Sequence, residues 1–114
     1  MNNLYEQTML FDFYGELLTE HQRKIFEDAL YNDLSLSEIA EEQGISRQGV
    51  HDLLKRCTKI LQGYEEKLHL VERFTQAKVT VEEIEKLAKA DGSEDVVDRL
   101  HKIELLSKEL LEHL

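Results

Sequence analysis

Apolar residues recur every three or four positions along most of this sequence, the spacing of one face of an α-helix. The pattern is clearest from Leu34 to Leu61, where two short helical stretches are separated by a glycine. In the first stretch Ser35 and Glu38 have the spacing of a capping box, in which each residue hydrogen-bonds the other's backbone. Ile39 and the small Ala40 then follow as core positions, so this stretch predicts a short helix that begins after Ser35.

The glycine, Gly44, stands where that helix must end, because a left-handed residue costs glycine no steric penalty. Ile45 is expected to return to the core, and Ser46 to cap a second helix. The resulting order of core, turn and cap positions predicts a helix-turn-helix motif. An ordinary helical corner without any nucleic-acid partner would show the same caps and spacings. The motif positions are Ser35, Glu38, Ile39, Ala40, Gly44, Ile45, Ser46, Val50 and Leu53.

Two further helices are expected before the motif. Residues 4–18 are apolar around nearly the whole helix, which indicates either a central core helix or one that partly buries against another chain. Thr19 and Gln22 form a second capping box at the start of the next helix. Its buried stripe is expected to be Ile25, Phe26, Ala29 and Leu30, with Arg23, Lys24, Glu27 and Asp28 facing water.

Beyond the motif, the apolar stripe of its second helix continues as far as Val71. It predicts a long helix from Arg47 to about Arg73, with Gly63 as the position of a bend. Residues 75–79 are the candidate linker, followed by helices capped by Thr80 and Ser93. The expected organisation is a helix-turn-helix core with an extended motif helix at 1–74. A C-terminal helical hairpin at 75–114 is expected to pack on the long helix or on a dimer partner.

Composition supports an all-α class and restricts the partners. The 114 residues include no proline and carry a net charge of −10, whereas DNA-binding proteins usually present a basic surface. Between Gly44 and Tyr64, however, the sequence contains four basic residues and a single acidic residue, Asp52, which gives this segment a local charge of +3. Cys57 is the single cysteine, and neither a signal peptide nor a membrane-spanning run is visible. A reducing, cytoplasmic location is the expectation.

If the motif reads DNA, its second helix supplies the contacts. Gln48 has the groups to bond an adenine edge, and Arg47 a guanine edge or a phosphate. Asp52 on the same face would repel phosphate. The alternative is that these side chains are simply the solvated face of a long helix. The candidate double-stranded DNA contacts are Arg47, Gln48, His51, Lys55, Arg56 and Lys59.

Catalysis is not expected, and neither a cofactor nor a metal ion is implied. The five histidines lack the spacing of metal ligands, and the sequence contains no glycine-rich phosphate loop. Cys57 falls on the apolar stripe, where a structural thiol is expected. The acidic composition leaves a second class of function open: a non-catalytic helical adaptor that binds a basic protein or ribonucleoprotein.

A homodimer is the expected assembly. The apolar surface at 4–18, the long motif helix and Leu105 opposite the main stripe of the last helix exceed what one small core can cover. Leu4, Phe11 and Leu105 are the candidate interface residues.

The segment LLTEHQRKIFEDALYNDLSLSEIAEEQGISRQGVHDLLKRC resembles the fourth region of bacterial sigma factors. From LYEQTMLFDFYGELLTEHQRK through SEIAEEQGISRQGVHD the chain resembles the YlxM family more closely. These are small helix-turn-helix proteins of Gram-positive bacteria. The resemblance implies an all-α fold and a regulatory role, and it implies an association with the signal recognition particle pathway of protein targeting. It is specific from about Leu4 to Leu70.

Overall fold

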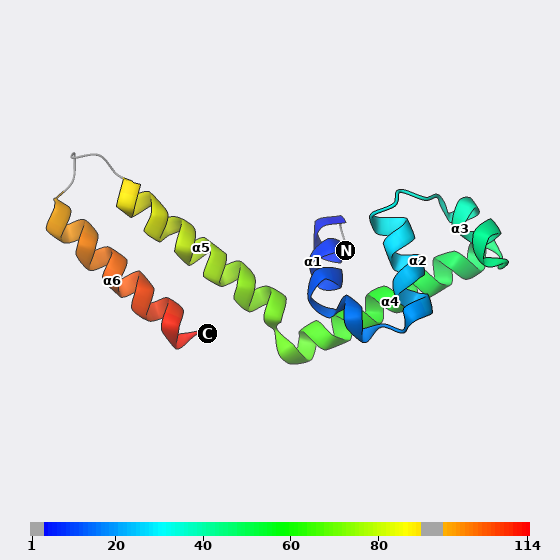
Figure 1. Ribbon diagram of the computed structural model, residues 1–114. Coiled ribbons are helices and arrows are strands. Elements are labelled where there is room, and N and C mark those ends of the chain that lie inside the picture. Colours follow the sequence, from blue (N-terminus) through cyan, green and yellow to red (C-terminus); the bar gives the residue numbers. More distant parts are fainter. Residues whose placement is uncertain (1–3, 90–94) are drawn as a thin grey trace. The chain divides into compact units, whose positions relative to one another are not determined.

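The computed structural model describes residues 4–89 and 95–114, and every regular element within these ranges is helical (Figure 1). Six α-helices and one short 3-10 helix follow one another in the described part of the chain. The contacts divide them into two compact units, residues 1–69 and 70–114. The all-α class and the helix-turn-helix core predicted from the sequence are confirmed. No helix in the described ranges is both long enough and apolar enough to cross a membrane.

The described residues of the first unit, 4–69, form four α-helices around one core. These are α1 (Leu4–Tyr14), α2 (Glu20–Leu30), α3 (Leu36–Gln43) and α4 (Arg47–Leu68), with the 3-10 helix η1 (Gly15–Leu17) between α1 and α2. α4 contacts each of the other three α-helices, and α2 also contacts α3. The fully buried side chains come from all four helices, so one core holds the motif together: Tyr14, Ile25, Asp28, Ile39, Val50, Cys57 and Leu61.

Both predicted capping boxes are present. The Thr19 hydroxyl accepts a hydrogen bond from the Gln22 backbone N–H (3.2 Å), and the Gln22 side chain accepts one from the Thr19 N–H (3.0 Å). Ser35 and Glu38 exchange the equivalent pair at 3.1 and 2.9 Å. Each box satisfies two backbone donors that the first turn of a helix leaves unpaired. The starts of α2 and α3 are therefore encoded locally.

The N-terminal helix is shorter than the apolar run from Leu4 to Leu18 predicted. It ends at Tyr14, and the chain tightens into η1. Phe11 stacks on Phe26 with ring centroids 5.2 Å apart, and it also lies 5.7 Å from the Tyr31 ring. A Cβ on Gly15 would lie 2.9 Å from the Phe11 ring, so this glycine makes room for the aromatic cluster. Phe11 thus packs on aromatic rings of its own unit and is half-buried, and its place in a dimer interface stays a prediction.

The prediction that Asp28 of α2 faces water was wrong. Asp28 is buried, with only 1% of its surface exposed. Its Oδ1 accepts hydrogen bonds from Lys24 Nζ (2.9 Å) and from Asn32 Nδ2 (2.8 Å). The bond from Lys24, followed by that from Asn32, lowers the pKa of the Asp28 carboxyl below its ordinary value. Helical periodicity predicted that Asp28 faces water, and it could not reveal these partners.

Asp28 should make the unfolding free energy of the first unit decrease at low pH. Because its pKa is lower in the folded state, its ionised form stabilises the fold above the unfolded pKa of about 4. That contribution is lost as the pH falls through the folded pKa. We expect Asp28→Asn to reduce the loss of unfolding free energy below about pH 4, as measured by urea unfolding at several pH values. A curve parallel to that of the wild type across this range would contradict the assignment.

The motif helix ends earlier than predicted. α4 stops at Leu68, and His69 takes a left-handed conformation with φ 57°. The His69 N–H donates to the Glu65 carbonyl and completes the last turn. Gly63, where a bend was expected, lies inside a continuous helix. The prediction of one helix through Arg73 was therefore wrong, because apolar periodicity resumes after His69 and hides the break.

The second unit is a hairpin of α5 (Leu70–Lys89) and α6 (Val96–Glu112), which contact each other. The expected linker at 75–79 lies inside α5, and Thr80 is not a cap: its hydroxyl donates to the Gln76 carbonyl within the helix. Ser93, the predicted cap of the last helix, lies outside the described residues. The Asp95 side chain accepts from the Val97 N–H and caps α6 instead. The boundary between the two units accordingly falls after His69, not after residue 74.

Candidate nucleic-acid interface

The turn between α3 and α4 sets the direction of the motif's second helix. Gly44 has φ 68° and ψ 29°, the left-handed conformation expected for it. The Ser46 hydroxyl then accepts from the Gly49 N–H at 2.9 Å and begins α4. Ile45 does not return to the core as predicted, because 40% of its surface is exposed. The turn is therefore fixed by the glycine and the serine cap, with little contribution from Ile45.

All six candidate contact residues lie on α4 and are exposed. The same helix buries Val50, Cys57 and Leu61 on its opposite side. This division gives α4 one face in the core and one face in water, as a recognition helix requires. The exposed candidates are Arg47, Gln48, His51, Lys55, Arg56 and Lys59.

Asp52 interacts with two of the candidate contact residues, Gln48 and His51. Gln48 Nε2 donates to Asp52 Oδ1 at 3.0 Å, and His51 Nδ1 lies 3.7 Å from the same oxygen. The amide of Gln48 is therefore partly committed within the helix surface. Any contact of Gln48 with an adenine edge must replace this exposed bond, whose net value is only about 1 kcal/mol.

A cleft of about 430 Å³ borders the basic side of α4. His51, Lys55 and Lys59 line it together with apolar side chains of α1 and α2, among them Leu4 and Phe26. The structure thus brings three of the six candidates to one place, while Arg47, Gln48 and Arg56 lie outside this lining. Three polar residues of the lining, Gln7, Thr58 and Gln62, were not identified from the sequence, because periodicity alone does not distinguish a cleft wall from an ordinary helix edge.

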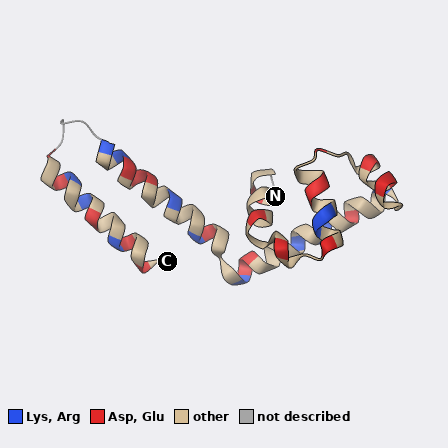
Figure 2. Ribbon diagram, viewed as in Figure 1, with Lys and Arg blue, Asp and Glu red and all other residues tan. Residues whose placement is uncertain are grey.

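Acidic residues flank the motif. α3 carries Glu38, Glu41 and Glu42 and no basic residue, whereas Lys and Arg positions recur along α4 (Figure 2). Glu41 and Glu42 are exposed. Phosphate would therefore be attracted to α4 and repelled by α3, which restricts any approach of a nucleic acid to one side of the motif.

Cys57 has no place in this exposed surface. Its side chain is fully buried, and burial raises the pKa of the thiol. A buried, protonated thiol is a poor nucleophile and behaves as a small apolar side chain. The residue thus contributes to the core that positions the exposed face of α4.

The helix-turn-helix geometry agrees with the comparison to known families. A family model described as "UPF0122: Putative helix-turn-helix protein, YlxM / p13 like" matches residues 1–103. The chain belongs to the UPF0122 family. The resemblance to the YlxM family noted in the sequence is therefore confirmed, and it reaches well into the C-terminal unit.

Curated UPF0122 relatives support the assignment. A UPF0122 protein of Desulforamulus reducens is 40% identical over 112 residues, covering 98% of this chain and 96% of its own. Another, from Acetivibrio thermocellus, is 53% identical over 78 residues, covering 68% of this chain and 67% of its own. A UPF0122 protein of Lactococcus lactis is 41% identical over 100 residues, covering 88% of each chain.

Proposed function

We propose that this UPF0122 protein is a non-catalytic regulator that binds double-stranded DNA through the exposed face of α4. The observation that carries the proposal is the helix-turn-helix itself, whose second helix presents Arg47, Lys55, Arg56 and Lys59 to solvent. Basic side chains spaced along one helix suit phosphates on both sides of a major groove. Arg47 lies in the first turn, the part of such helices that contacts base edges.

The net negative charge of the protein should limit its affinity for DNA and make that affinity depend on salt. With a net charge of −10 and a local charge of +3 over residues 44–64, affinity depends on a few phosphate contacts and falls steeply with salt. A homodimer would present two copies of α4 and favour a site with two-fold symmetry. The family resemblance adds the signal recognition particle pathway as the setting, with components of that machinery as further partners.

The test is a titration of labelled duplex DNA with the full chain at low and at moderate salt. Binding is measured by the fluorescence anisotropy of the DNA. We expect Arg47→Ala combined with Lys55→Ala to lower the affinity at least ~10-fold, because two charged contacts are each worth about 1 kcal/mol or more. Helicity should stay unchanged, since both side chains are exposed.

The matched control is Lys78→Ala combined with Lys108→Ala. This variant removes the same charge from exposed positions of α5 and α6 and should retain wild-type affinity. Equal losses in the two double variants would mean that net charge alone governs binding. The absence of any duplex binding by the wild type at low salt, where electrostatic contacts are strongest, would overturn the proposal.

A second candidate function follows from the acidic exposed surfaces. A helical adaptor that binds a basic protein or ribonucleoprotein would use complementary charge to raise the rate of encounter. The exposed Glu41 and Glu42 of α3 favour this reading. The two functions separate in one experiment, because an adaptor without DNA binding would leave duplex anisotropy unchanged at every salt concentration.

A further inference from the structure

The C-terminal hairpin leaves its apolar residues half-buried or exposed. None of the described residues of α5 or α6 is buried. Large apolar side chains remain strongly exposed, with Leu111 at 71% and Val97 at 73% of their surface. Ordering a helix costs about 1–2 kcal/mol per residue, and burial of apolar surface is the main effect that offsets this cost. The hairpin therefore lacks a core of its own. Further exposed apolar side chains are Leu70, Phe74, Val79, Val81, Val96, Leu100, Leu105 and Leu114.

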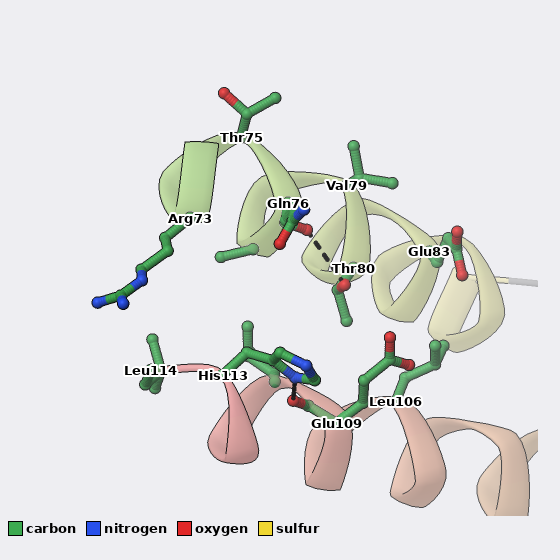
Figure 3. Close-up of a pocket in the computed structure, with 12 residues that line it drawn as sticks. Arg73, Thr75, Gln76, Val79, Thr80, Glu83, Leu106, Glu109, His113 and Leu114 are labelled. Atoms are coloured by element: carbon green, nitrogen blue, oxygen red, sulfur yellow. Dashed lines mark hydrogen bonds between the residues drawn. The ribbon is translucent and has the colours of Figure 1, made fainter. Parts of the chain in front are cut away.

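A groove of about 500 Å³ runs between the two helices (Figure 3). Its wall on α5 includes Gln76, Val79 and Thr80, and its wall on α6 includes Leu106 and Leu110. A neighbouring apolar depression lies at Leu87, Leu105 and Leu106, between Lys86 and Lys102. The two helices are thus in contact but leave an open furrow along the hairpin, of the kind that a further helix fills in a bundle.

Charge is distributed unevenly along the groove. Arg73 lies at the end formed by the start of α5 and the C-terminus, beside His113 and Leu114 (Figure 3). Glu83 and Glu109 lie farther along it, on the side of Leu106. Arg73 and Glu83 are ten residues apart on one helix, which corresponds to about 15 Å. A second α5 laid antiparallel across the groove would therefore bring each Arg73 opposite the other chain's Glu83.

We propose that this groove is the interface with a second copy of the chain, in which the two hairpins pair about a two-fold axis near residue 78 to form a four-helix bundle. Two-fold pairing makes a surface complementary to itself, and the arrangement of Arg73 and Glu83 about residue 78 has this property. The α5–α6 face is about 26 Å long and about 20 Å wide. That is the scale of a standard interface, which buries about 800 Å² per partner. The inference specifies the surface of the proposed homodimer and does not depend on DNA binding.

Charge reversal tests the pairing directly. In sedimentation equilibrium of the full chain at micromolar concentration, we expect the wild type to have twice the 13.4 kDa mass of one chain. Arg73→Glu alone places four carboxylates in two facing pairs, and Glu83→Arg alone places four cations there. Each variant should weaken dimerisation at least ~10-fold, because like charges juxtaposed at an interface are strongly unfavourable.

Mixing the two single variants is the decisive measurement. In a mixed dimer both facing pairs carry opposite charges again, so an equimolar mixture should dimerise within ~3-fold of the wild-type constant. Combining both reversals in one chain should restore the homodimer in the same way. Lys108→Glu is the matched control, because it makes the same charge change at an exposed position outside the groove lining and should leave dimerisation unchanged.

The remaining outcomes count against the inference in distinguishable ways. A monomeric wild type overturns both the dimer and this interface. Dimers that survive both single reversals retain the proposed dimer but move it to another surface. Single variants that become monomeric and do not recover on mixing show that Arg73 and Glu83 do not face each other across the interface, which overturns the proposed pairing. Circular dichroism of each variant separates these outcomes from loss of helicity.

Discussion

Replacing Ile39 by alanine should cost the first unit about 2–5 kcal/mol of unfolding free energy. Ile39 lies on α3 with none of its surface exposed, in a cluster with Ile25, Ala40 and Val50. Removing its three outer carbons loses their transfer free energy and leaves a cavity that the surrounding helices fill only partly. Because this cluster holds α3 against α2 and α4, the position of the recognition helix should be lost together with stability. Urea unfolding followed by circular dichroism measures the change.

Ile45→Ala is the matched control, since it deletes the same atoms six residues later in the same motif. Ile45 is 40% exposed, so we expect its truncation to cost less than about 1 kcal/mol. The sequence pattern assigned both isoleucines to the core, whereas the structure separates them. Equal losses for the two variants would show that the turn is packed as the sequence suggested.

Gly44→Val should destabilise the first unit by about 1–2 kcal/mol. The residue has φ 68°, and a Cβ built there meets no atom within 4 Å. The expected cost is therefore backbone strain alone, because a β-branched residue is strongly disfavoured in the left-handed region. The midpoint of urea unfolding should decrease while its slope stays constant.

Gly63→Ala should instead raise the stability, although Gly63, like Gly44, has open space where a Cβ would lie. Gly63 lies inside α4, its φ is not positive, and a Cβ there also has no neighbour within 4 Å. Alanine should stabilise the helix by up to about 1 kcal/mol, because glycine loses more backbone freedom on folding. If both substitutions shifted the unfolding free energy in the same direction, the left-handed backbone conformation would not explain the effect of replacing Gly44.

Several local features could be predicted because neighbouring residues encode them. The capping boxes at Thr19 and Ser35 need only a hydroxyl and a side-chain carbonyl three residues apart. The reversal at Gly44 needs only the absence of a side chain, and the apolar stripe of α4 needs only helical spacing. These interactions span four residues or fewer, so the sequence determined the helix-turn-helix and the helix that carries its candidate contacts.

Features that join distant residues could not be predicted in the same way. Tyr14 donates to Glu65 at 2.6 Å across 51 positions, and Phe11 stacks on a ring of α2. No glycine marks the end of α4 at His69, and the apolar pattern continues both before and after this residue. The sequence consequently predicted one long helix and a later linker, whereas the chain divides into two units after residue 69.

The sequence by itself determined the all-α class, the helix-turn-helix and the exposed position of Arg47, Lys55 and Lys59. Only the tertiary structure decided that Asp28 is buried, that Ile45 is not, and that the C-terminal hairpin leaves an open groove between its helices. The reason is physical. Helix starts and faces depend on hydrogen bonds and periodicity within a few residues, whereas burial depends on which helices meet. Amphipathic spacing is the same whether an apolar stripe is covered or left exposed.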